Sequence, residues 1–424
     1  MAEDHAHNAI KRQTEIYLNG AAGLKPAVPV NMTTLEQKAA KKMSAEAAAY
    51  IIGGAGTERT ISENRKAFER WKIVPRMLRD VSQRDTSVAI LGQTIPYPLL
   101  LSPVGVLEMV HPKADIAVAK AAAETGIPYI FSNQASRSME DCASVMGDSP
   151  HWFQLYWSKS DELVTSFVQR AEACGSKAIV VTLDTTLLGW RMQDLDLAYL
   201  PFLRGKGIAQ YISDPVFNQL IEEPPVGPPP ERKITLSSIS MLLELVRSYP
   251  GSFFKNLRSG KPLTSVRKFI EIYSRPSLTW ENLSFLRGIT QLPILLKGIL
   301  HPDDARKALD MGMDGLIVSN HGGRQVDGAI SSFGALPAIA EAVNRKVPVL
   351  LDSGVRSGAD IFKAIALGAN SVCIGRPYVY GLTLAGQQGV KEVINNITAD
   401  FELTMGLAGC KNISEIHRDL LVRI

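Results

Sequence analysis

The 424-residue chain has little of several features that would each assign it to a particular class of protein. It has four cysteines, Cys142, Cys174, Cys373 and Cys410, which lie far apart, without a C-x-x-C pair or a histidine at metal-ligand spacing. This pattern argues against a disulfide framework and a zinc site. No apolar run approaches the roughly 20 residues of a membrane helix, and the N-terminus lacks the basic and apolar regions of a secretory signal. We therefore expect a cytoplasmic protein with reduced thiols, no metal and no membrane span.

An excess of charge of one sign is also missing. The 46 Lys and Arg residues nearly balance 42 Asp and Glu residues, and the net charge of +4 is spread along the chain without a dense basic run. Nothing in this distribution predicts nucleic acid or an anionic membrane as a partner. Small anionic substrates remain compatible with it. The last residues, Leu421 to Ile424, differ from a peroxisomal Ser-Lys-Leu signal.

The chain does contain a regular alternation of short apolar runs and helical segments from Pro98 onward. This alternation predicts βα units around a parallel sheet. Eight such runs are present, and eight strands close a (β/α)8 TIM barrel. The predicted strands are residues 99–102, 129–132, 152–156, 178–183, 294–297, 315–319, 347–352 and 371–374.

Two further regions flank or interrupt the predicted barrel of residues 96–424. Residues 1–95 are predicted to form a helical segment that packs on the barrel, with a helix over 36–50 that ends at a glycine cluster. About a hundred residues separate the fourth and fifth strands, far more than an ordinary connection. We interpret residues of about 196–278 as an insertion that covers the site as a lid or reaches a neighbouring subunit.

The insertion contains two stretches of distinct composition. The proline-rich residues 223–230 are predicted to be extended or mobile. A disordered surface excursion explains this part equally well. Residues 236–246 have a helical pattern.

The most informative stretch is Ser319-Asn320-His321-Gly322-Gly323-Arg324-Gln325, which directly follows a predicted strand. TIM barrels keep their chemistry at the C-terminal ends of the strands. His321 can exchange a proton near neutral pH, and Arg324 offers a planar fork for a carboxylate or phosphate. The glycines allow the backbone to approach a flat ligand. A glycine-rich loop with a solvated His and Arg is the alternative, but their joint occurrence at a strand end favours a site.

The loops after the seventh and eighth predicted strands indicate a phosphate site. They contain residues 352–358, with Gly354 and Arg356, and residues 374–377, with Gly375 and Arg376. TIM barrels commonly bind phosphate in these two loops, through backbone N–H groups and a helix N-terminus. Two glycine turns with surface arginines are the alternative interpretation.

The stretch from Ser319 to Gln325 resembles the active-site signature of the FMN-dependent 2-hydroxy-acid oxidases and dehydrogenases, the family of glycolate oxidase and lactate oxidase. The resemblance extends from about Tyr50 to the C-terminus. It implies FMN as cofactor, a small 2-hydroxy acid and O2 as substrates, and a homotetramer or homo-octamer. It also implies FMN-binding positions, with Ser353 where many relatives have Gly. These positions are Pro103, Val104, Gly105, Ser132, Gln154, Thr182, Lys297, Ser319, Asp352, Ser353, Gly354, Arg356, Gly375 and Arg376.

The same resemblance implies roles for the polar residues around the substrate. His321 would be the base, Asp184 would orient its imidazole, and Tyr156 would contact the substrate oxygen. Lys297 would stabilise the negative charge of a reduced flavin. The substrate carboxylate would be bound by Tyr50, Arg191 and Arg324.

Within the family, three features resemble the lactate 2-monooxygenase branch: Gly105, where many oxidases have Ala, the run of residues 194–205, and the long insertion. This implies conversion of L-lactate and O2 to acetate, CO2 and water. An oxidase that releases pyruvate and H2O2 is the alternative. A phosphate-binding barrel of another class and a non-catalytic flavoprotein also remain open. The wall around the substrate side chain is predicted to contain Val104, Leu107, Gln134 and Leu188.

Overall fold

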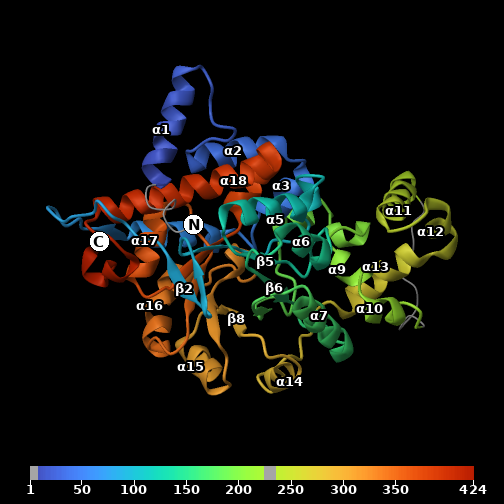
Figure 1. Cartoon of the computed structure of the whole chain (residues 1–424). Coiled ribbons are helices and arrows are strands. Elements are labelled where there is room, and N and C mark those ends of the chain that lie inside the picture. Colours follow the sequence, from blue (N-terminus) through green and yellow to red (C-terminus); the bar gives the residue numbers. More distant parts are fainter. Residues whose placement is uncertain (1–7, 224–234) are drawn as a thin grey trace.

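The computed structural model describes residues 8–223 and 235–424, and its centre is a closed barrel of eight parallel strands (Figure 1). Each predicted apolar run forms one strand, which confirms the predicted TIM barrel. The barrel strands are β4 (Leu99–Leu101), β5 (Tyr129–Phe131), β6 (His151–Leu155), β7 (Ile179–Thr182), β8 (Ile294–Ile299), β9 (Gly315–Val318), β10 (Val349–Asp352) and β11 (Ser371–Ile374).

The strands are buried on both faces, which explains why their sequences are almost continuously apolar. Side chains such as Ile130, Trp152 and Leu350 fill the barrel interior. The other faces of the strands are covered by an outer layer of helices: α5 (Ala114–Thr125), α6 (Met139–Met146), α7 (Asp161–Ala173), α14 (Asn282–Ile289), α15 (Pro302–Asp310), α16 (Ser332–Val343), α17 (Gly358–Ala366) and α18 (Arg376–Leu407). Among the residues described, no helix combines the length and the apolar character needed to cross a membrane.

The N-terminal region contains more than the predicted helices. Its helices are α1 (Asn8–Ala21), α2 (Met32–Lys42), α3 (Ala45–Ile52) and α4 (Arg59–Glu69). The single helix expected over residues 36–50 is wrong, because the side chain of Ser44 accepts a hydrogen bond from the Ala47 N–H and starts a new helix.

Three short strands in this region were also missed. Strands β2 (Val88–Ile90) and β3 (Gln93–Ile95) form a hairpin whose Ile90 and Ile95 join the apolar cluster inside the barrel. Strand β1 (Trp71–Ile73) pairs with β12 (Leu421–Arg423), 350 residues later. The N-terminal region is therefore bound to the barrel by strands as well as helices.

The insertion after β7 consists of short helices: α8 (Met192–Asp196), the 3₁₀ segment η2 (Pro201–Arg204), α9 (Ala209–Ile212), α10 (Pro215–Leu220), α11 (Leu236–Ser248), α12 (Phe253–Ser259) and α13 (Lys261–Ile272). The predicted helix over 236–246 lies within α11. The proline-rich residues 224–230 lie outside the described residues. Figure 1 shows α11 and α12 projecting to one side of the barrel, with α9 and α10 closer to it.

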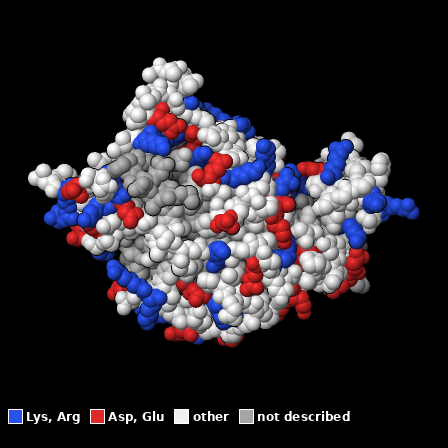
Figure 2. Space-filling view, in the orientation of Figure 1, with Lys and Arg blue, Asp and Glu red and all other residues white. Residues whose placement is uncertain are grey.

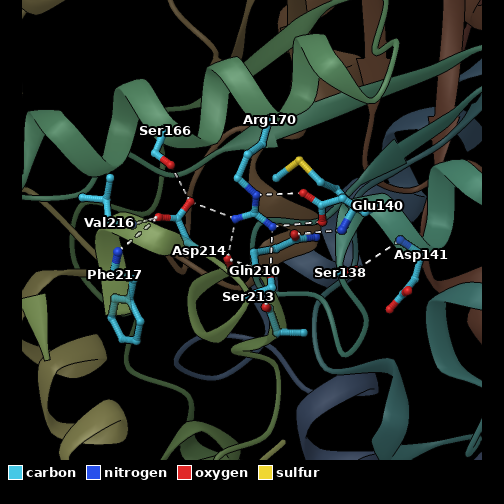
Figure 3. A network of polar contacts seen from close by, with 12 residues as sticks. Ser138, Glu140, Asp141, Ser166, Arg170, Gln210, Ser213, Asp214, Val216 and Phe217 are labelled. Carbon is cyan, nitrogen blue, oxygen red and sulfur yellow. Dashed lines mark hydrogen bonds and ion pairs between the residues drawn. The ribbon is translucent and has the colours of Figure 1, made fainter. Parts of the chain in front are cut away.

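The first part of the insertion is fixed to the barrel by a polar network around Arg170 of α7 (Figure 3). Arg170 forms ion pairs with Glu140 of α6, at 2.8 Å, and with Asp214, at 2.9 Å. Asp214 is fully buried, and its other oxygen accepts hydrogen bonds from the backbone N–H groups of Val216 and Phe217 at the start of α10. The segment from η2 to α10 is therefore anchored to the barrel by Asp214, because this buried carboxylate has both a paired charge and hydrogen-bonded oxygens.

The surface carries both signs of charge. In the view of Figure 2, acidic and basic side chains are interspersed over the face of the barrel, and no large field of one sign is visible there. This agrees with the near balance of charges in the sequence.

Candidate active site

A cavity opens at the C-terminal ends of the barrel strands and encloses about 1030 Å³ of empty space, including its mouth. Residues from the N-terminal region, from the ends of all eight barrel strands and from the insertion meet there. Sixteen of the predicted site residues line it: Tyr50, Pro103, Val104, Gly105, Ser132, Tyr156, Arg191, Lys297, His321, Arg324, Asp352, Ser353, Gly354, Arg356, Gly375 and Arg376.

His321 and Asp184 form the pair expected of an oriented base. His321 Nδ1 lies 2.8 Å from Asp184 Oδ1. Burial and the charges of His321 and Lys297 act on Asp184 in opposite directions, and the net effect lowers the pKa of this carboxyl. An ionised Asp184 can only accept a hydrogen bond, so Nδ1 carries the proton and Nε2 is left with a free lone pair. The arrangement thus prepares His321 to take up a proton at Nε2.

The backbone of His321 is in a strained conformation, with φ of 58°, in the left-handed region. Non-glycine residues seldom adopt this region, and those that do cluster at functional sites. Gly322, at φ 65°, continues the same tight turn. The turn brings the imidazole of His321 into the cavity beside Arg324.

Lys297 supplies a permanently charged ammonium group on the cavity floor. Its side chain is nearly inaccessible, and its Nζ lies 3.2 Å from Asp352 Oδ2 and 3.1 Å from Ser319 Oγ. Burial alone would lower the pKa of Lys297, but the Asp352 and Asp184 carboxylates raise it above its ordinary value. Lys297 is therefore fully protonated and can stabilise negative charge on a ligand next to it.

Arg324 and Arg191 also line the cavity. Burial, and to a lesser degree Arg191, lowers the pKa of Arg324 to about 9. Neither arginine forms an ion pair with a carboxylate of the described ranges 8–223 and 235–424. The guanidinium of Arg324 lies over the ring of Tyr50, 5.0 Å from its centroid. Arg191 is buried and Arg324 is half-buried, and two adjacent cations of this kind suit an anion such as a carboxylate.

The loops after β10 and β11 also line the cavity. A Cβ added at Gly354 would lie 2.7 Å from the Asn64 carbonyl oxygen, so the chain passes too close there for a side chain. Ser353, where many relatives have Gly, has φ of 82°, and its Oγ accepts a hydrogen bond from the Gly322 N–H. Arg376 donates to the carbonyls of Ile51, Gly53 and Gly322, which holds its guanidinium rigidly at the wall.

These features suit a flavin mononucleotide. The negatively charged phosphate would lie among the glycine loops and Arg356. The flavin ring system would lie next to Lys297, whose positive charge suits a ring that becomes negative on reduction.

Four predicted cofactor or catalytic residues stand one layer behind the lining: Gln154, Thr182, Asp184 and Ser319. Gln154 connects two strand ends, since its Oε1 accepts from Ser132 Oγ and its Nε2 donates to Thr182 Oγ1. Ser319 Oγ donates to Asp352 Oδ2. The structure thus places these four residues where they orient the residues that line the cavity.

The predicted substrate wall is partly wrong. Val104, Gln134 and Leu188 line the cavity, but Leu107 is fully buried in the hydrophobic core behind it. The sequence also missed Thr185, Phe202 and Tyr273, which do line the cavity. Phe202 and Tyr273 come from the irregular insertion, where no periodic pattern shows which side chains point inward.

Residues 39–423 match the family model described as FMN-dependent dehydrogenase. The chain is 42% identical over 395 residues to an L-lactate oxidase of Lysinibacillus sphaericus, covering 93% of each protein. It is also 42% identical to an FMN-dependent alpha-hydroxy acid dehydrogenase of Penicillium citrinum, covering 97% of this chain and 95% of the relative.

A crystal structure of mandelate oxidase superimposes with a TM-score of 0.74 at 32% identity, covering 94% of this chain and 99% of the other. These matches confirm the resemblance noted in the sequence and establish FMN as the cofactor. The chain therefore belongs to the FMN-dependent dehydrogenase family, as an FMN-dependent 2-hydroxy-acid oxidoreductase.

Proposed function

We propose that the protein oxidises L-lactate with O2 and decarboxylates the product before it leaves, so that acetate, CO2 and water are released. The observation that carries this proposal is the position of Gly105. A Cβ at this residue would lie 2.9 Å from the Gln134 carbonyl oxygen and 3.5 Å from the Tyr50 hydroxyl. The absence of a side chain therefore lets the loop of Gln134 lie close to Gly105, with the Tyr50 hydroxyl at ordinary contact distance, and this close approach favours retention of the product.

A small substrate agrees with the wall of the cavity. Phe202 and Tyr273 project from the insertion, and Phe202 lies 6.5 Å from Tyr50 between ring centroids. Together with Leu188 and Gln134 they surround the space next to the two arginines. A short aliphatic 2-hydroxy acid such as lactate would place its methyl group against this wall and its carboxylate on the cations.

We assign each step of the proposed reaction to a residue whose position in the cavity supports it. Arg324, Arg191 and the Tyr50 hydroxyl bind the carboxylate. His321 takes a proton from the substrate at Nε2, and Asp184 stabilises the imidazolium that forms. FMN, held by the glycine loops and Lys297, would supply the two-electron acceptor that the oxidation needs and the means of passing those electrons to O2. Lys297 holds positive charge where the reduced cofactor becomes negative.

An oxidase that releases pyruvate and H2O2 is the second candidate. It is favoured by the relatives of Lysinibacillus sphaericus and Nostoc, which are both named L-lactate oxidase and are 42% and 38% identical to this chain. The two outcomes differ only in whether pyruvate leaves before the peroxide reacts with it. A difference of about 1–3 kcal/mol in the barrier to pyruvate release decides between the two outcomes.

A product balance tests the proposal. The purified protein is supplied with L-lactate and air, and acetate, pyruvate and H2O2 are measured per O2 consumed. One acetate and little H2O2 per O2 supports the proposal. One pyruvate and one H2O2 per O2 makes the protein an oxidase. Absence of O2 uptake with bound FMN refutes both, and other hydroxy acids such as glycolate and mandelate are then compared.

We also propose a homotetramer or homo-octamer, by analogy with the family. Light scattering coupled to size exclusion measures the mass of the assembly. A monomer would contradict this part of the proposal.

A further inference from the structure

Gln134 is a buried residue of the cavity wall whose side-chain amide has no partner within residues 8–223 and 235–424. The residue is 9% exposed and lines the cavity. Its Oε1 and Nε2 are not among the polar atoms that are sealed in the protein interior, so the amide reaches open space. Polar groups at this depth normally have a hydrogen-bond partner. A ligand in the cavity can provide it.

The backbone of Gln134 is held on both sides. Its N–H donates to Ser132 Oγ at 3.1 Å, and its carbonyl accepts from the Val106 N–H at 2.9 Å. The preceding side chain, Asn133, accepts a hydrogen bond from the Tyr211 hydroxyl at 2.9 Å. The loop after β5 is therefore fixed, and it supports the Gln134 amide as a rigid element would support a binding group.

The neighbours of Gln134 are residues assigned above to the substrate. A Cβ added at Gly105 would lie 3.1 Å from the Gln134 Cβ and 3.5 Å from the Tyr50 hydroxyl. A Cβ added at Gly207, in the insertion, would lie 3.0 Å from the Gln134 carbonyl oxygen and 3.2 Å from the ring of Phe202. Gln134 is therefore close both to a proposed carboxylate ligand and to the aromatic wall.

The chemistry of an amide limits the group that it can bind. Gln134 offers two N–H donors and one accepting oxygen, without charge. A methyl group beside it would displace water and replace none of the lost hydrogen bonds, whereas a hydroxyl would restore them. A second carboxylate would lack the positive charge that Arg191 and Arg324 offer the first. An uncharged hydroxyl is therefore the group that fits.

We propose that the cavity accepts 2-hydroxy acids with a second hydroxyl on C3, and that Gln134 is the specificity-determining residue that binds this hydroxyl. The inference rests on the proposed oxidation of 2-hydroxy acids. It extends the substrate class beyond lactate, in which C3 is a methyl group. The probe for this class is L-glycerate, which is lactate with one methyl hydrogen replaced by a hydroxyl.

Oxidation of L-glycerate follows the same course as that of lactate. The C2–H bond and the O–H bond at C2 break, a C2 carbonyl forms, and two electrons pass through FMN to O2. The products are 3-hydroxypyruvate and H2O2, or glycolate, CO2 and water if the product is decarboxylated in the site. The C3 hydroxyl is unchanged in the oxidation.

Two pairs of acids that differ by this one hydroxyl test the inference on the FMN-loaded protein. L-lactate and L-glycerate are compared by the second-order rate constant of anaerobic flavin bleaching. Propanoate and 3-hydroxypropanoate, which have no hydroxyl at C2 to oxidise, are compared by their Kd in calorimetric titration. The proteins are the unchanged chain, Gln134→Met and the exposed control Gln291→Met. Gln134→Leu replaces the methionine variant if that variant does not retain FMN.

We expect L-glycerate to bleach the unchanged protein at least as efficiently as L-lactate. In Gln134→Met, the ratio of the rate constant for L-glycerate to that for L-lactate should fall about 10- to 100-fold, because the partner of the C3 hydroxyl is gone. The preference for 3-hydroxypropanoate over propanoate in Kd should fall in parallel. Gln291→Met should keep both ratios.

Unchanged ratios in Gln134→Met would overturn the inference, even if both acids of a pair were weakened equally, because Gln134 would then contact what the two acids share. L-glycerate that bleaches the unchanged protein more than about tenfold less efficiently than L-lactate would also overturn it. Failure of the proposed function gives a different result. Neither L-lactate nor L-glycerate would bleach the flavin, while a Kd ratio that still falls in Gln134→Met would support the contact with the hydroxyl.

Discussion

Two opposing influences set the basicity of His321. Burial is the larger and favours the neutral imidazole, whereas the Asp184 carboxylate favours the imidazolium. The net effect lowers the pKa of His321 below its ordinary value of 6.5. A base must be neutral to accept a proton, so the reaction should lose rate as the pH falls through this lowered pKa, below 6.5.

Asp184→Asn tests this balance. Removing the carboxylate leaves burial unopposed, so the pKa of His321 falls further and the acid limb of the rate of flavin reduction moves to lower pH. The plateau rate should drop by about 100-fold or more, because the imidazolium loses its partner. Stopped-flow reduction from pH 4.5 to 8 measures both. An acid limb that moves to higher pH would contradict the electrostatic account.

The guanidinium of Arg324 is expected to bind the substrate carboxylate through its planar fork. Arg324→Lys should raise KM by about 10- to 100-fold, because a point charge replaces a planar fork over the Tyr50 ring. Steady-state kinetics measure KM, and the flavin absorbance spectrum checks that cofactor binding is intact. The exposed Arg345→Lys is the matched control. Unchanged KM and turnover would remove Arg324 from the carboxylate site.

The sequence predicted the polar residues of the site better than its apolar wall. His321 and Arg324 follow β9, and Lys297 lies in the C-terminal half of β8, where position along the chain determines position in the site. Phe202 and Tyr273 could not be predicted in the same way, since they belong to irregular segments whose direction depends on tertiary packing. Leu107 was assigned to the wall wrongly because its neighbours at 104 and 105 do line the cavity, and the short 3₁₀ turn of residues 107–109 redirects it to the core.

At the scale of elements, the insertion is attached to the barrel unevenly. Its first part is held by the buried Asp214 and by Tyr211, whose hydroxyl donates to Asn133 Oδ1 beside Ser132. Gln210 also donates to the Ser132 carbonyl. These contacts connect the insertion to the loop that carries Ser132, which lines the cavity. Glu244 of α11 forms ion pairs with Arg204 and Lys206, in and just after η2. Both pairs are partly exposed, so each contributes little to stability.

Asp214→Ala should release the first part of the insertion. It removes the partner of the buried Arg170 charge and the acceptor at the start of α10, and should cost about 3 kcal/mol of stability. Limited proteolysis should then cut residues 200–220 much faster, and Tm should fall. The exposed Asp196→Ala, also in the insertion, should change neither. Equal protease resistance of the two variants would show that the network in Figure 3 does not anchor the segment.

The predicted elements were most accurate where the chain repeats a simple unit. All eight barrel strands were found from apolar runs bounded by turns. The β2–β3 hairpin was missed because each of its strands has only three residues, too few for an alternating pattern to be recognised. Pairing of β1 with β12 joins residues at opposite ends of the chain, and nothing local in either strand indicates the other.

At the scale of the whole molecule, the cofactor site joins distant parts of the chain. Its lining comes from the ends of β4 and β5, from Lys297 in β8, and from the loops after β10 and β11. A ligand that binds only the folded site should therefore stabilise the entire barrel. FMN at 100 times its Kd should add about 2.7 kcal/mol to the free energy of unfolding.

Riboflavin distinguishes the contribution of the flavin ring to binding from that of the phosphate. It has the ring system but not the phosphate, so it cannot use the glycine loops at Gly354 and Gly375 or the charge of Arg356. The rise in Tm of the flavin-free protein should be clearly smaller with riboflavin than with FMN at equal concentration. Equal rises would show that the phosphate loops contribute little to binding.

The residues of the aromatic wall and those of the cavity floor lie in different parts of the chain, and this arrangement affects how the substrate preference of such a protein can change in evolution. The aromatic wall and Arg191 lie in one continuous stretch between β7 and β8, whereas the phosphate loops and most of the cavity floor lie in the other barrel units. Lineages that inherit this barrel can exchange or lengthen that one stretch and acquire a new substrate while the redox centre is passed on unchanged. Recombination at the ends of β7 and β8 would exchange the aromatic wall and Arg191 together, while Tyr50, Gln134 and Arg324 stayed with the barrel.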